Sequence, residues 1–309
     1  TVQSDIIKLV SASFKDNAPK VRTAAAYVAG SFVMHPCFQT KAILATFSNN
    51  ILSLLKTEDT LVVVSRCAWA LANLCICIHQ LVQTDCHEPY DVPKQISHAV
   101  ISLAQNYEDQ SQTQDKIRTS SIRALGSLGQ FWASAALSTT EEANEFQTSM
   151  SRKGKRKQNM ERAKHGATQD ERIMLESVAR TLLKHLDKGS AKTIWNGCHA
   201  MGGIFETACN TCEAGFIVKQ DWHDEALAML IVCLESANFK VRINAVAALR
   251  MLKTKDEFLT DGQRLDTRLA VAQCLENVNA DTEFSQYQYR ETLIQECTAT
   301  LAHLDGMQE

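Results

Sequence analysis

Small and apolar residues recur at helical spacing along the whole chain, and polar turn residues bound each run. In residues 20–30, Ala25, Val28 and Ala29 fall on one side of a helix. A stripe of this kind lets two helices approach closely and bury each other. The pattern predicts twelve helices in consecutive pairs, at residues 2–13, 19–34, 38–56, 60–82, 94–107, 115–137, 170–186, 190–208, 222–235, 240–252, 265–277 and 287–304.

The second helix of most pairs carries one motif, which sets the length of a repeat. The motif has an arginine in the first turn and a glycine further along. Aligning position 22 with positions 65, 118, 194 and 242 gives spacings of 43, 53, 76 and 48 residues. Removing residues 84–93 and 138–169 reduces the two long spacings to 43 and 44 residues, a period typical of helical solenoids. The repeat positions are Arg22, Gly30, Arg118, Gly126, Gly202 and Arg242.

Both residue types have an expected role in packing the repeats together. At Gly30, Gly126 and Gly202 a side chain would collide with the next repeat, which justifies the glycine penalty of roughly 1 kcal/mol in a helix. The arginine is polar on an otherwise apolar helix. We expect it to reach an acid or a carbonyl near the preceding turn, with Asp16 the candidate for Arg22.

Composition agrees with a repeat protein and narrows its chemistry. A chain of 309 residues is longer than those that usually fold around a single hydrophobic core. Stacked repeats explain this length, because each repeat packs only on its neighbours. Four prolines and 6% aromatic residues fit a mostly helical protein. No membrane span is expected, because polar residues interrupt the longest apolar stretch, residues 61–82. Eleven scattered cysteines disfavour a disulfide framework and favour an intracellular location, in the cytoplasm with the nucleus as a second candidate.

The whole chain resembles HEAT repeats. Residues 192–205 and 238–249 resemble consecutive segments of the HEAT repeat-containing protein 6 family, and residues 289–304 resemble a later helix of that family. Thr193 and Ile194 stand where the family has valine and arginine. The resemblance implies an intracellular α-solenoid with no catalytic residues to carry over.

We therefore predict an all-α fold, a right-handed α-solenoid of about five to six HEAT- or armadillo-like helical hairpins. Residues 1–137 would form repeats 1–3 and residues 170–309 would form repeats 4–6. Thr1 is not a methionine, so we expect the chain to be a fragment of a longer protein.

Motifs for catalysis and metal binding are weak. Residues 197–203 lack the lysine and hydroxyl of a phosphate-binding loop, and residues 126–129 lack the spacing of a nucleophile elbow. Cys209 and Cys212 have zinc-ligand spacing, but the usual second close pair is missing, and packed thiols at a helix end are the alternative. We expect no enzymatic activity, no cofactor, no metal and no small-molecule substrate.

One pair of residues suggests a peptide-binding surface. Trp69 and Asn73 lie four apart on one helical face, in a Trp-Ala-Leu-Ala-Asn-Leu string that resembles armadillo repeats. In those proteins such a pair lines a groove, where the indole forms a wall and the amide holds an extended peptide backbone. Only this pair has the spacing here, so packing between repeats is the alternative interpretation.

Charge is unevenly distributed although the total is only −3. Residues 151–165 hold seven basic residues and one acid, a net +6 that leaves −9 elsewhere. Residues 138–169 have few apolar side chains and are predicted to form a charged, flexible insertion. Its basic cluster is a candidate nuclear-import signal, a nucleic-acid contact or a solvated loop, and the acidic remainder disfavours nucleic acid. The cluster comprises Arg152, Lys153, Lys155, Arg156 and Lys157.

These patterns predict a non-enzymatic scaffold or adaptor that presents a curved solenoid surface to other proteins. The alternative is a transport-receptor-like module that grips linear peptides and shuttles to the nucleus. The sequence does not identify the partner.

Overall fold

The chain folds almost entirely into α-helices, as the periodicity predicts. The computed structural model describes residues 2–84, 91–107, 111–148, 169–210, 221–252, 258–280 and 287–306. Those ranges hold twelve α-helices, one short 3-10 helix and no strand. The predicted all-α fold of paired helices is therefore confirmed.

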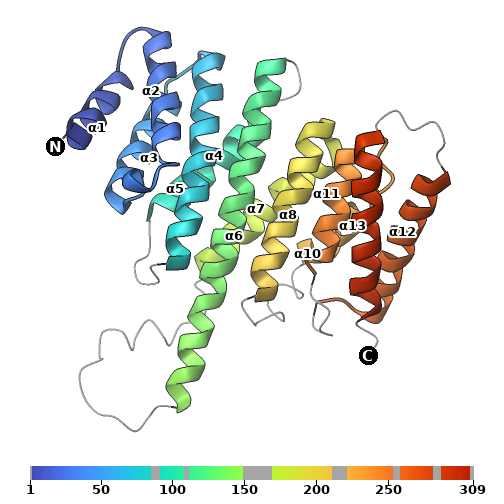
Figure 1. Ribbon diagram of the computed structural model, residues 1–309. Helices are drawn as coiled ribbons and strands as arrows, with labels where there is room; N and C mark the ends of the chain where they lie inside the picture. Colours follow the sequence, from blue (N-terminus) through green and yellow to red (C-terminus); the bar gives the residue numbers. More distant parts are fainter. Residues whose placement is uncertain are drawn as a thin grey trace. The chain divides into compact units, whose positions relative to one another are not determined.

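Residues 1–131 form one unit and contain the first three helical pairs (Figure 1). In chain order the elements are α1 (Val2–Ser13), α2 (Pro19–Phe32), η1 (Pro36–Phe38), α3 (Lys41–Leu55), α4 (Leu61–Thr84), α5 (Asp91–Asn106) and α6 (Gln112–Thr148), whose last part belongs to the second unit.

Residues 132–309 form the second unit, which holds three further pairs (Figure 1). Its helices are α7 (Gln169–Lys188), α8 (Ala191–Asn210), α10 (Asp221–Cys233), α11 (Phe239–Arg250), α12 (Asp261–Ala280) and α13 (Tyr287–Asp305).

Within each unit the helices of successive pairs form two rows. The first helices pack on one another, as α1 does on α3 and α7 does on α10. The second helices, α2 with α4 and α8 with α11 and α13, contact each other far more extensively. This difference follows from the sequence, because the small residues Ala25, Ala29 and Gly30 of α2 are buried and let α4 approach closely.

Local turn chemistry sets where the second helices begin. Pro19 occupies the first turn of α2, where its fixed backbone angle suits the helix and its missing N–H is not needed. The Asp16 carboxylate accepts the Ala18 N–H at 2.7 Å and closes the preceding turn. At α11 the Asn238 side chain accepts the N–H groups of Lys240 and Val241, which caps the helix.

α4 is a core helix of the first unit. Residues 61–80 are long and apolar enough to cross a membrane by length and composition, which corrects the expectation that their polar residues exclude this. Most of this stretch, 67%, is buried inside the protein. The core helix of a folded protein passes the same test, since packing against α2, α3 and α5 demands the same apolar residues.

α6 runs beyond its predicted end. The sequence placed that end at Leu137 and a flexible insertion at residues 138–169, whereas α6 continues to Thr148. No glycine or proline lies between residues 138 and 148, and alanine and glutamate there favour helix. Residues 149–168, which carry the basic cluster, lie outside the described residues.

Candidate protein-interaction surface

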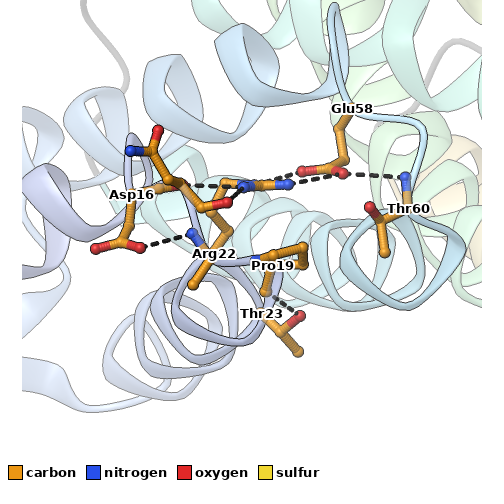
Figure 2. A network of polar contacts seen from close by, with 8 residues as sticks. Asp16, Pro19, Arg22, Thr23, Glu58 and Thr60 are labelled. Atoms are coloured by element: carbon orange, nitrogen blue, oxygen red, sulfur yellow. Dashed lines mark hydrogen bonds and ion pairs between the residues drawn. The ribbon is translucent and has the colours of Figure 1, made fainter.

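Arg22 ties the start of α2 to the turn before α4 (Figure 2). Its Nε donates to Oε2 of Glu58 at 2.6 Å, and its Nη2 donates to Oε1 at 3.1 Å. Its Nη1 donates to the carbonyls of Asp16 and Asn17, both at 2.9 Å. The expected contact with a carbonyl of the preceding turn is therefore present, whereas the acid is Glu58 of the following repeat and not the carboxylate of Asp16.

The Glu58 carboxylate is held in its charged form. Its side chain is 3% exposed, and it also accepts the Thr60 N–H at 3.0 Å. The hydrogen bond from Arg22 lowers the pKa of Glu58 to about 2, against the opposing effect of burial. This network joins two repeats, and the hydrogen bonds of Arg22 and Glu58 go to groups of the protein itself.

The repeat glycines lie where the second helices touch. A Cβ at Gly30 would lie 2.7 Å from Cζ3 of Trp69 and 2.8 Å from Cα of Ala70 in α4. A Cβ at Gly202 would lie 2.9 Å from Cα of Ala248 in α11. The predicted collision with the next repeat is thus present at both positions. Gly126 is buried in α6.

Asn73 takes part in packing between repeats. Its side chain is 6% exposed, and its Nδ2 donates to the Gly30 carbonyl of α2 at 2.9 Å. Cys77, one turn later, donates its thiol to the Val33 carbonyl at 3.0 Å. These contacts satisfy carbonyls at the C-terminal end of α2, where intrahelical partners run out. The amide of Asn73 is therefore committed to α2, and only the Trp69 half of the sequence-predicted pair lies partly exposed.

Trp69 belongs to an aromatic cluster that the α2 and α4 helices build together. Its ring stacks on Tyr27 with centroids 5.4 Å apart and an interplanar angle of 18°. The Arg66 guanidinium lies 5.0 Å from the Tyr27 centroid and 5.5 Å from that of Trp69. Tyr27 is 51% exposed. We call Tyr27, Arg66 and Trp69 the first cation–aromatic cluster.

The second unit repeats this arrangement across three successive second helices. Lys240 of α11 places its Nζ 4.8 Å from the Trp195 ring centroid of α8 and 5.2 Å from that of Tyr289 in α13. We call Trp195, Lys240 and Tyr289 the second cation–aromatic cluster. All three side chains are partly exposed. Sequence reasoning missed both clusters, and the only signal for the second was an aromatic and a lysine close to the repeat positions 194 and 242.

Charges differ between the two rows of helices. In the second helices α2, α4, α8 and α11, basic residues predominate, and Glu206 is the one acid. The first helices α10 and α12 carry more acids than bases, whereas α7 carries four of each. α6 and α13 depart from the trend. α6 carries four acids and three bases, and two of the acids of α13 pair with arginines, Glu296 with Arg250 and Asp305 with Arg268. The basic residues of the four helices are Lys20, Arg22, Arg66, Lys192, Lys240, Arg242 and Arg250.

Of the two cysteines that have zinc-ligand spacing, one lies within the described residues. Cys209 is buried at the end of α8, and Cys212 lies outside the described residues. Across the part of the chain that the structure describes, no group of three metal-ligating side chains occurs. Other thiols pack in the core, and burial raises the pKa of Cys67 to about 12, which disfavours the thiolate.

Comparison with known proteins shows the fold and no family. No family model matches the chain. An uncharacterized protein of Dictyostelium discoideum is 29% identical over 143 residues, a match that covers 43% of this chain. The match spans only 9% of the length of that protein.

Three solved structures resemble the chain over nearly its full length. Two engineered proteins align with TM-scores of 0.57 and 0.55 at 13% and 14% identity, and each alignment covers 97% of this chain and 97–98% of the other. A designed armadillo repeat protein aligns with a TM-score of 0.53 at 15% identity, over 96% of this chain and 98% of its own. At such identities the likeness shows the fold alone. The predicted class, an armadillo- or HEAT-like helical solenoid, is confirmed.

Proposed function

We propose that this chain is a non-enzymatic scaffold that binds other proteins through its second helices. The observation that carries the proposal is the half-exposed Tyr27, stacked on Trp69 beside Arg66. Tyrosine, tryptophan and arginine are the residues that dominate binding energy at protein interfaces. The second cluster places the same kinds of residue on the second helices of the other unit.

The buried polar side chains support a structural role more than a catalytic one. The Glu58 carboxylate accepts hydrogen bonds from Arg22 and Thr60. The Asn73 amide donates a hydrogen bond to the Gly30 carbonyl. Catalytic acids and bases need an unsatisfied hydrogen-bonding position that faces a substrate. Neither Glu58 nor Asn73 has such an unsatisfied position. In the proposed scaffold, the exposed face therefore binds partners and the buried network stabilises the fold.

The transport-receptor-like alternative loses part of its chemical basis. Gripping an extended peptide requires an amide that faces the peptide backbone, and the amide of Asn73 faces α2. Nuclear import through residues 152–157 remains a separate proposal. A reporter fused to residues 145–170 that stays in the cytoplasm would exclude import. An intracellular location and kinship with the HEAT repeat-containing protein 6 family also remain proposals.

Site-specific crosslinking tests the scaffold role. A photo-crosslinking phenylalanine at position 27 of α2 or position 199 of α8 should capture the same partner protein from cell lysate. Matched controls carry it at Leu9 of α1 or Ile173 of α7, which are exposed on first helices. Adducts should form at the second-helix positions and be weak or missing at the controls. Equal capture at all four positions, or capture confined to the first helices, would contradict the proposal.

A further inference from the structure

We infer that each cation–aromatic cluster, within its own unit, binds carboxylates of an acidic, extended segment of a partner protein. This inference rests on the proposed scaffold function and adds the chemistry of the partner. It assigns Arg66 and Lys240 as the groups that meet the acidic side chains, with the aromatic rings holding each cation in place.

Both cations are positioned but not neutralised. Arg66 contacts the rings of Tyr27 and Trp69, and Lys240 contacts those of Trp195 and Tyr289. Among the described residues, neither cation has a carboxylate within ion-pair distance. Other surface arginines do, as Arg180 does with Glu176 and Arg268 does with Asp305. A cation that is already fixed loses less side-chain entropy when it binds a carboxylate, so its N–H donors favour an external anion.

The charge around the clusters favours an acidic partner and disfavours a basic one. Lys20 lies on α2 with the first cluster, and Lys192 lies on α8 with Trp195 of the second. Both lysines are exposed, and α2, α4 and α11 carry no acid between residues 19 and 32, 61 and 80, or 239 and 250. The first helices α10 and α12 carry more acids than bases, so an acidic segment is drawn to the clusters and repelled from these two helices.

The aromatic geometry favours protein over nucleic acid. Single-stranded nucleic acid binds aromatic residues by stacking bases on open ring faces. Tyr27 and Trp69 stack on each other with Arg66 against them, and Lys240 lies over the rings of the second cluster. These contacts occupy a face of each ring. Polar N–H groups of the cations remain for carboxylates.

A defined acidic probe tests the inference on the full chain. The probe is a fluorescein-labelled peptide of ten glutamates, and its binding is followed by fluorescence anisotropy at low salt. Arg66→Met and Lys240→Met keep the side-chain bulk and remove the charge. Each should weaken binding by about three- to tenfold, and the double variant should weaken it further. Lys8→Met on α1 and Lys184→Met on α7 remove the same charge from exposed first-helix positions and should change binding less than about twofold.

Three results would overturn the inference. One is equal weakening of peptide binding by the cluster variants and the control variants, which would show that binding depends on net charge and not on the clusters. Another is no binding of the peptide by the wild-type chain. The third is tighter binding of a ten-nucleotide oligouridine that responds to the same two variants, which would assign the clusters to nucleic acid. Unchanged circular dichroism and melting temperature establish that each variant is folded. If Arg66→Met does not fold, Arg66→Gln is used in its place.

The crosslinking experiment separates this inference from the scaffold role. If position 27 captures a partner while the glutamate peptide fails to bind, the scaffold function stands and the acidic partner is wrong. If both experiments fail, the proposed function itself is wrong.

Discussion

Arg22 and Glu58 join two consecutive repeats through a two-point ion pair, with Nε–Oε2 at 2.6 Å and Nη2–Oε1 at 3.1 Å. The pair links the first turn of one second helix to the turn before the next. Because Glu58 is almost fully buried, its charge is screened little by water, and its loss would leave the arginine without its acid.

The first prediction concerns the pH dependence of this ion pair. The folded pKa of Glu58, about 2, lies below an unfolded value near 4.3. Its stabilisation is therefore complete above the unfolded pKa and is lost as the pH falls from about 5 to about 2. Glu58→Gln should lower the free energy of unfolding by about 2 kcal/mol at pH 7 and by about 1 kcal/mol at pH 3, measured by urea denaturation.

A matched control is Glu176→Gln, which breaks an exposed pair with Arg180 at 2.7 Å within α7. Exposed pairs of this spacing contribute about 0.3–0.5 kcal/mol, so this variant should change stability little at either pH. A Glu58→Gln effect of equal size at pH 7 and pH 3 would show that the carboxylate is not held in its charged form.

The second prediction concerns the contact between second helices. Gly30→Ala and Gly202→Ala would each press a methyl group against the backbone of the next helix, Ala70 or Ala248. The helix must shift, and we expect a loss of about 1–3 kcal/mol in unfolding free energy despite the better helix propensity of alanine. Gly262→Ala is the control, since nothing lies within 4 Å of its added Cβ. That variant should be neutral or more stable, and equal losses at all three glycines would refute the packing role.

Much of the fold could be predicted because its signals are local. Proline at position 19 and asparagine at position 238 mark where helices begin, and these features lie within a few residues of the boundaries they set. The spacing of Gly30 and Gly202 also identified where the second helices touch, since only a close backbone contact explains glycine in a buried helix. The end of α6 was missed because a charged, weakly apolar stretch can be helix or loop by composition alone.

The candidate surface could not be predicted because its members come from different helices. Trp69 was singled out, but its stacking on Tyr27 depends on the register between α2 and α4, which periodicity does not give. The contact of Arg22 with Asp16 was predicted and is made through the Asp16 carbonyl, but the ion pair with Glu58, 36 residues away, was missed. Asn73 looked like a groove residue because a helical face does not reveal whether a neighbouring backbone covers it.

The third prediction distinguishes packing from peptide binding at Asn73. Asn73→Ala would leave the Gly30 carbonyl without its 2.9 Å hydrogen bond in a buried site. We expect the free energy of unfolding to fall by about 1–3 kcal/mol in urea denaturation. Asn196→Ala is the control, because within the described residues that amide bonds to Lys192 in its own helix, and it should cost no more than a few tenths of a kcal/mol. A stable Asn73→Ala variant that loses peptide binding would restore the groove interpretation.

The last prediction concerns His223 of α10, whose side chain is fully buried against the edge of Phe205, with ring centroids 5.5 Å apart. Burial lowers the pKa of His223 and outweighs the raising effect of Asp224, whose carboxylate lies 3.4 Å from Nδ1. The folded chain therefore keeps this imidazole neutral, while the unfolded chain takes up a proton below about pH 6.5.

Because the unfolded state binds the extra proton, stability contributed by His223 is present above pH 6.5 and falls as the pH drops below it. Wild-type protein should lose about 1 kcal/mol more than His223→Leu between pH 7 and pH 5.5, followed by tryptophan fluorescence in urea, since Trp222 is buried beside it. His199→Leu removes an exposed histidine of α8 and is the matched control for losing an imidazole outside the core. If His223→Leu loses as much stability as the wild type over this range, the buried imidazole is not the group that titrates on unfolding.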